Sequence, residues 1–251
     1  MSLEVINADA AELELEEAIL IYGGRSRNTH TTYATVHAVT VTPDAPPVIE
    51  AGRPLDLASL RRFAKKAVAS LKVGTGLLPA NVLALGMDYV AWWSPATTRH
   101  HYFECRQTTD RVSVGTRNGL APTCDLIFVA TAKSLSVYAF KGDGKTRPDA
   151  DTPIMFAPYM NVYESGGLCL GSMNVPKGSL IDVIPAWEAS FFGSAFTHPN
   201  NHSGVNYKGG LHQLSKDLLD GKYKRFPQRA LKAMGKTTLG QLIKHFDNGR
   251  K

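Results

Sequence analysis

The chain has 251 residues, of which 43% are hydrophobic, so it can bury the core of one large domain or of a core domain with appendages. Its formal net charge of +6 is unevenly distributed, because residues 201–251 contain eleven Lys or Arg against three Asp. The sequence contains no run of about 18 apolar residues that could span a bilayer, and residues 1–24 are acidic where a secretory signal would be basic. The three cysteines fit neither a disulfide framework nor a Cys-x-x-Cys metal site. We therefore expect a cytoplasmic protein without a metal, a cofactor or a membrane segment.

The N-terminal segment favours β-structure. Residues 18–22 are apolar and lead into a Gly-Gly pair, which is typical of a strand that runs into a turn. Residues 31–41 are rich in Thr, Val and Tyr and predict a second strand, which would complete a hairpin. Because Asp-Ala-Pro-Pro at 44–47 then interrupts the pattern, we predict a β-rich N-terminal extension over residues 1–52.

Residues 53–200 predict a core that mixes both kinds of element. Asp56 can cap an amphipathic helix that reaches Leu71 and ends at Gly74. Strands are then predicted over residues 89–93, 100–105, 126–130 and 135–140, the last two forming a β-hairpin. A helix, four antiparallel strands and a proline-bounded loop in this order indicate an α+β fold.

The remaining chain is predicted to be helical. A helix begins near Pro185, and we assign its aromatic face to the core rather than to a site; this face comprises Trp187, Phe191, Phe192 and Phe196. Further helices are predicted over residues 211–219, 228–234 and 237–246, the last capped by Thr237 or Thr238. Residues 201–251 would thus form a basic helical region.

The excess of Lys and Arg over Asp in residues 201–251 has two possible explanations. One is a solvated helical face. The other is a docking surface for an acidic protein or for nucleic acid, for which Lys222, Lys224 and Arg225 are the partner-binding candidates.

The proline-bounded loop at 153–169 contains the residues that suggest chemistry. Pro153 and Pro158 favour stiff, extended backbone, and Gly166, Gly167 and Gly171 allow a positive φ and leave space beside the sulfur of Cys169. A lone cysteine is most often a small buried hydrophobe. We expect that role for Cys105 and Cys124, which lie in or beside apolar, β-prone stretches.

Cys169 differs because Asn161 precedes it by eight residues, in the pattern Asn-Val-Tyr, spacer, Gly-apolar-Cys-Leu. This pattern resembles the active-site loop of ubiquitin-conjugating enzymes, in which a His-Pro-Asn tripeptide precedes the catalytic cysteine at the same spacing. Asn161 and Cys169 match by position. The tripeptide here is Tyr159-Met160-Asn161, and the missing histidine affects the expected loop geometry more than the thioester chemistry.

A longer pattern narrows the resemblance. Four short motifs follow one another between residues 157 and 198: Ala-Pro-Tyr-Met-Asn-Val, Gly-Gly-Leu-Cys-Leu-Gly-Ser-Met, Trp-Glu-Ala-Ser-Phe-Phe and Phe-Thr-His. Together they resemble the divergent bacterial branch known as PRTRC system protein B, prokaryotic conjugating-enzyme family D. The resemblance implies a conjugating-enzyme-like core over residues 53–200, with a helix, a four-stranded antiparallel meander, the active-site loop and further helices.

The resemblance also implies a mechanism. Cys169 would take the acyl group of a carrier protein from another thioester and pass it to an amine. Asn161 would donate a hydrogen bond to the oxyanion, a contribution worth ~3 kcal/mol in tested enzymes, unless it only bonds its own loop backbone. His198 would replace the missing histidine as a base or loop-orienting group, unless it lies in a turn-rich surface loop.

The implied partners are a ThiF-like activating enzyme as donor, a small ubiquitin-like protein as cargo and a JAB-type metallopeptidase as antagonist. In bacteria such sets lie together on mobile elements. Gly-Asp-Gly-Lys-Thr at 142–146 lacks the first glycine of a phosphate-binding loop, so we expect that the protein does not bind ATP itself.

Two other functions stay open. The first is a binding module of the same fold without chemistry, in which Cys169 is buried between Leu168 and Leu170. The second is a plasmid-maintenance protein that binds nucleic acid through its basic region, with an affinity that falls steeply with salt.

Overall fold

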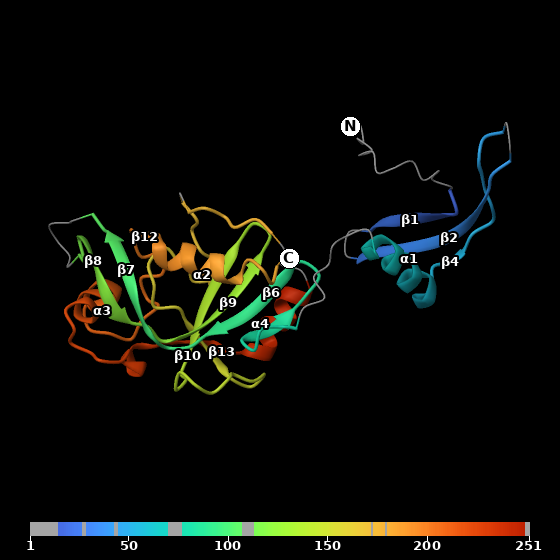
Figure 1. The fold of residues 1–251 in the computed structure, drawn as a ribbon. Coiled ribbons are helices and arrows are strands. Elements are labelled where there is room, and N and C mark those ends of the chain that lie inside the picture. The colour runs from blue at the N-terminus through green and yellow to red at the C-terminus, as the bar shows by residue number, and fades with distance from the viewer. Residues whose placement is uncertain are drawn as a thin grey trace. The chain divides into compact units, whose positions relative to one another are not determined.

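The structure is a computed structural model that describes residues 15–26, 29–42, 45–69, 77–106, 113–171, 173–178 and 180–248. The chain divides into two compact units, residues 1–76 and residues 77–251. Both are drawn in Figure 1. None of the helices in the described ranges is long and apolar enough to cross a membrane.

The first unit is built on an antiparallel hairpin. Strand β1 (Glu17–Ser26) pairs with β2 (Thr29–Thr40), and the short strands β3 (Val48–Ile49) and β4 (Arg53–Pro54) also pair with β2. The predicted hairpin is therefore present.

Helix α1 (Leu57–Ala69) follows in the same unit. Asp56 caps it as predicted, since its Oδ1 accepts a hydrogen bond from the amide of Ser59 at 2.7 Å. The predicted end of this helix at Gly74 lies outside the described residues. We expected a domain boundary at residue 52, with this helix in the core, whereas the compact units divide after Gly76.

A six-stranded antiparallel sheet forms the centre of the second unit. Its strand order is β13-β11-β10-β9-β6-β5. These strands are β5 (Val82–Leu85), β6 (Tyr89–Ser94), β9 (Asp125–Thr131), β10 (Leu135–Phe140), β11 (Pro153–Phe156) and β13 (Ala233–Thr238). The predicted hairpin of β9 and β10 is confirmed, and a 2.8 Å hydrogen bond between the hydroxyls of Thr131 and Ser134 closes its turn.

The four expected strands do not form one continuous meander. β6 pairs directly with β9, while β7 (Thr98–Glu104) leaves the central sheet and joins β8 (Thr116–Pro122) and β12 (Ala195–Phe196) in a second sheet. The burial pattern explains this difference. Every residue of β6 and β10 is buried, as central strands covered on both faces require, whereas β7 has several exposed residues.

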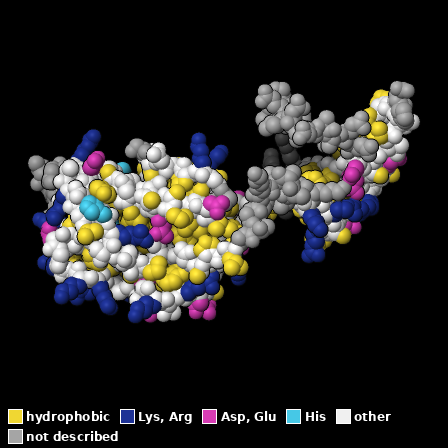
Figure 2. All heavy atoms as spheres, viewed as in Figure 1, with side chains coloured by type: hydrophobic (Ala, Val, Ile, Leu, Met, Phe, Trp, Pro, Cys, Tyr) yellow, Lys and Arg dark blue, Asp and Glu magenta, His cyan; other side chains and the backbone are white. Residues whose placement is uncertain are grey.

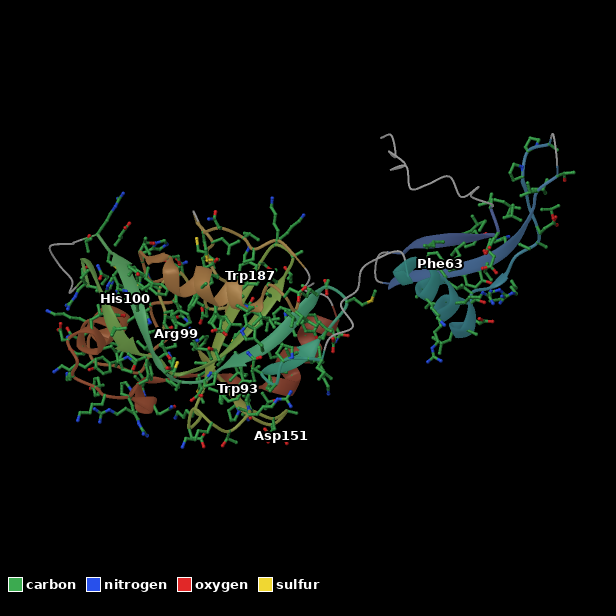
Figure 3. The ribbon with its side chains drawn as sticks, in the orientation of Figure 1. Phe63, Trp93, Arg99, His100, Asp151 and Trp187 are labelled. Atoms are coloured by element: carbon green, nitrogen blue, oxygen red, sulfur yellow. The ribbon has the colours of Figure 1, made fainter. Side chains whose placement is uncertain are left out.

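Helices cover both faces of the central sheet. Helix α2 (Ile184–Gly193) packs on one face, and α4 (Leu239–Asp247) packs on the other. Trp187 of α2 and Trp93 of β6 accordingly lie on opposite sides of the sheet (Figure 3). The aromatic face that we assigned to the core is buried as predicted, although Phe196 belongs to β12 rather than to the helix.

The basic C-terminal region is part of this fold rather than a helical appendage. Helices α3 (Gly210–Leu219) and α4 match their predictions, and Thr238 caps α4 through a capping box with Gln241. The helix predicted over residues 228–234 is wrong. Only a 3-10 turn forms at Gln228–Ala230, and β13 then pairs with β11, because that open sheet edge offers backbone partners that outweigh local helix propensity.

Candidate active site

Residues 161–169 form a tight hairpin that brings Asn161 opposite Cys169. The amide of Cys169 donates a hydrogen bond to the carbonyl of Asn161 at 2.7 Å, and Val162 and Leu168 form the next antiparallel bridge. The amide of Tyr163 then donates to the carbonyl of Gly167 at 2.8 Å. The eight-residue spacing noted in the sequence is therefore the length of this hairpin.

This cysteine hairpin (residues 161–169) is docked on the first residues of β10. The amide of Leu168 donates to the carbonyl of Leu135 at 2.9 Å, and the amide of Val137 donates to the carbonyl of Gly166 at 2.8 Å. The cysteine is thus held by backbone hydrogen bonds to a buried central strand rather than by a free loop.

Gly166 and Gly171 have the positive φ that we expected, but the space at Gly166 is not beside the sulfur. Gly166 adopts a φ of 87°, and a Cβ atom added to it would lie 2.2 Å from the ring of Tyr138. The absence of a side chain at Gly166 therefore makes space for the ring of Tyr138 and not for the sulfur of Cys169. The Tyr138 hydroxyl donates a hydrogen bond to the carbonyl of Ser165 at 3.0 Å.

Asn161 joins the hairpin to the segment that contains β12. Its φ of 63° is in the left-handed region, which asparagine tolerates better than most residues. Its Nδ2 donates to the carbonyl of Ala195 at 3.0 Å, and its Oδ1 accepts from the amide and the hydroxyl of Thr197 at 3.1 and 2.9 Å. The Asn161 carboxamide thus bonds to residues more than thirty positions along the chain. The alternative, in which it bonds only to the backbone of its own loop, does not hold.

His198 lies beside Asn161 and is exposed. Its carbonyl accepts a hydrogen bond from the Asn161 amide at 2.9 Å, and its Nδ1 lies 2.9 Å from the hydroxyl of Thr197. The structure therefore brings the three predicted residues Cys169, Asn161 and His198 into one region, with Asn161 in contact with both others.

Cys169 is the accessible thiol of the three. It is half-buried, whereas Cys105 and Cys124 are buried as predicted. Burial raises the pKa of the Cys105 thiol to about 11, and burial together with the nearby charge of Asp125 raises the pKa of Cys124 further. Neither of these two thiols is suited to nucleophilic chemistry at neutral pH.

Tyr163 is a site residue that our sequence analysis missed. Its pKa is raised, first by a side-chain hydrogen bond with Cys169 and then by the charge of that sulfur. In the hairpin register Tyr163 opposes Gly167, so it is a diagonal neighbour of Cys169 on the same face. An Asn-x-Tyr pattern opposite a cysteine in a hairpin is the sequence signal that would have found it.

The three basic candidates line two different hollows. Lys222 makes an ion pair with Asp217, at 2.5 Å between Nζ and Oδ2. Lys224 and Arg225 instead line a separate groove with residues of the loop after β10. Within the described ranges, no group of three His, Cys, Asp or Glu side chains is placed to hold a metal ion.

Comparison with known protein families gave a match that covers most of the second unit and helix α1. The model of a family described as prokaryotic E2 family D, where E2 denotes the ubiquitin-conjugating enzymes, matches residues 59–234, which is more than half of the chain and includes Asn161, Cys169 and His198. No curated protein and no solved structure gave a significant match.

Proposed function

Because the chain belongs to prokaryotic E2 family D, we propose that it is a conjugating enzyme that carries a ubiquitin-like protein as a thioester on Cys169. The observation that supports this most directly is the half-buried thiol held opposite Asn161 by a 2.7 Å backbone hydrogen bond. An activating enzyme of the ThiF type would supply the cargo, and a JAB-type metallopeptidase would remove it from its acceptor.

In the first step, the Cys169 thiolate attacks the carbonyl carbon of the donor thioester. A new C–S bond forms, the negative charge moves onto the carbonyl oxygen, and the donor thiolate leaves when this intermediate collapses. The hydroxyl of Tyr163, which hydrogen-bonds to Cys169, would lie beside the sulfur during this step.

In the second step, an amine attacks the thioester carbon. The C–N bond forms, the C–S bond breaks, and Cys169 is released as a thiolate while the amine loses a proton. His198 is the exposed base nearest to Asn161 in the hydrogen-bond network and is our candidate for the group that accepts this proton.

Asn161 would stabilise the oxyanion of this second step. Its Nδ2 has two hydrogens, and the bond to the carbonyl of Ala195 uses one of them. The remaining hydrogen and the rigid anchoring of the carboxamide by Thr197 are what an oxyanion donor needs, because such a donor must be oriented before the charge develops.

A charging assay tests the proposal. The protein is mixed with its cognate activating enzyme, ubiquitin-like protein and ATP, and adducts are separated on a gel without reductant. We expect an adduct that thiol reagents cleave, and Cys169→Ser should form an oxyester adduct that resists the same reagents. Absence of any adduct, while the activating enzyme forms its own thioester, would contradict the proposal.

A binding module without chemistry is the second candidate. The observation in its favour is that Leu168 and Leu170, on either side of Cys169, pack against the hydrophobic core. In that case Cys169 would resist alkylation in the folded protein, and the charging assay would give no adduct.

A further inference from the structure

A groove of about 480 Å³ lies at the end of the central sheet where β10 finishes. Four segments line it: the β6–β7 turn, the β8–β9 connection, the loop at 142–145 that follows β10, and the segment after α3. The cysteine hairpin docks beside the first residues of the same strand, so the groove is separate from the proposed thioester site.

Positive charge dominates the lining of this groove. Its cations are Lys145, Lys224 and Arg225, which are exposed and take part in no ion pair with any residue that the structure describes. Figure 2 shows Lys and Arg side chains along the lower margin of the larger unit, where Figure 1 draws the orange segments around and after α3. An anionic ligand would find a surplus of positive charge here.

The one carboxylate in the lining does not offset this surplus by pairing with a cation. Asp143 accepts hydrogen bonds from the amides of Lys145 and Thr146 at 2.8 and 2.7 Å and from the hydroxyl of Thr146 at 2.8 Å. These bonds lower the pKa of Asp143 to about 2. They also occupy the amides that a phosphate-binding loop would use, so an anion in the groove must be held by side chains.

Gln228 is a lining residue with an unpartnered amide oxygen. Its Nε2 donates to the carbonyl of Gly142 at 3.1 Å, whereas its Oε1 is buried and has no partner among the described residues. A buried acceptor without a donor costs free energy. A ligand N–H or O–H group would remove that cost once the Gln228 side chain turns toward the groove.

We infer that this groove binds a phosphorylated small molecule of mononucleotide size. Its phosphate would contact Lys145, Lys224 and Arg225, and a hydrogen-bond donor elsewhere in the molecule would bond to Gln228. The volume is in the range of about 300–1,000 Å³ that is common for small-molecule sites. The guanidinium of Arg225 can bind a phosphate through two parallel hydrogen bonds.

Calorimetric titration of the full chain tests this inference without activating enzyme or cargo, so its outcome is independent of the thioester proposal. AMP, inorganic phosphate and a hexaglutamate peptide are titrated at low salt. We expect saturable binding of AMP that is tighter than that of inorganic phosphate and weakens as salt is added.

Variants locate the binding. Lys224→Gln with Arg225→Gln should weaken AMP at least about tenfold, as the loss of charge-assisted hydrogen bonds predicts. The charge-matched control Lys133→Gln with Lys236→Gln changes two exposed lysines away from the groove and should leave the affinity unchanged. Gln228→Leu should weaken AMP more than inorganic phosphate, although it also removes the bond to the Gly142 carbonyl in the loop that contains Lys145.

Three results would overturn the inference. The first is the absence of saturable AMP binding in the folded wild-type chain. The second is an equal loss of affinity in the groove variant and in its control. The third is a hexaglutamate peptide that binds more tightly than AMP, which would assign the groove to an acidic protein segment instead.

Discussion

Cys169 and Asn161 are joined across the base of one hairpin, with the Cys169 amide 2.7 Å from the Asn161 carbonyl. The second arm of that hairpin pairs with β10, and the Asn161 side chain bonds to Ala195 and Thr197. The positions of the thiol and the carboxamide are therefore fixed by each other and by two separate parts of the core.

The three thiols should differ in reactivity. In the native protein at neutral pH, iodoacetamide should modify Cys169 and leave Cys105 and Cys124 unmodified, because burial raises the pKa of both. Mass spectrometry of the digested protein measures the sites, and the same reaction in denaturant should modify all three. Equal modification of the three in the folded protein would show that the described burial is wrong.

Tyr163→Phe should slow the alkylation of Cys169. Loss of the hydroxyl removes the group that hydrogen-bonds to the Cys169 sulfur, and a rate roughly three- to tenfold lower is expected. Tyr102→Phe, at an exposed tyrosine of β7, is the matched control and should behave as wild type.

Variants of Asn161 separate anchoring from catalysis. Asn161→Asp keeps an oxygen acceptor for Thr197 but loses the amide donor, including its bond to the Ala195 carbonyl. Thr197→Val leaves the donor and removes the hydroxyl contacts with Asn161 and with His198. If Asn161 stabilises the oxyanion, Asn161→Asp should slow discharge of the charged thioester to free lysine by about 10²-fold, a much larger effect than that of Thr197→Val. Similar losses in both variants would indicate anchoring alone.

The pH dependence of stability should report on His101. This residue is buried among Phe103, Tyr159 and Phe196, and desolvation lowers its pKa from 6.5 to about 4. The folded state then binds fewer protons than the unfolded state. The free energy of unfolding should therefore fall by about 3 kcal/mol in total as the pH drops from about 6.5 to about 4.

Urea unfolding of two variants isolates this contribution. His101→Phe should flatten the decline between these pH values, since a phenyl ring has no proton to gain. His100→Gln, at the exposed neighbour labelled in Figure 3, should leave the decline as in wild type. An unchanged slope in His101→Phe would assign the acid sensitivity to other groups.

Deletion of residues 203–251 should unfold the second unit rather than remove a separable basic tail. The deleted segment contains a strand of the central sheet and the buried residues Leu214, Leu231 and Leu242. Each buried leucine stabilises the fold by about 1.5–3 kcal/mol. Circular dichroism of the truncated protein should show loss of structure. Nucleic-acid binding is therefore better tested in the full chain, with the double variant Lys224→Gln and Arg225→Gln. The double variant Lys133→Gln and Lys236→Gln is the control.

Features that depend on local residues could be predicted from the sequence. Thr238 caps α4 because its hydroxyl accepts from an amide three residues on, and the β9–β10 turn closes within four residues. The spacing of Asn161 and Cys169 also belongs to this class, because one hairpin contains both.

Features that depend on distant partners could not be predicted in this way. β13 forms because β11 presents an open edge, which Ala233–Thr238 does not reveal on its own. The exit of β7 from the central sheet depends on its pairing with β8 and β12. The ion pair of Lys222 with Asp217 likewise depends on how α3 and the following segment pack, which the order of residues does not reveal.

Gly166 shows how strictly the fold controls the reactive sulfur. Its left-handed backbone and the ring of Tyr138 exclude any side chain at this position, yet it lies three residues from Cys169 and takes no part in the proposed chemistry. A substitution there would lift the hairpin from β10 and displace the thiol without altering any reacting group. Loss of activity at position 166 would accordingly be a geometric defect, and a smaller residue at position 138 alone could not repair it, because the backbone angle would still be strained.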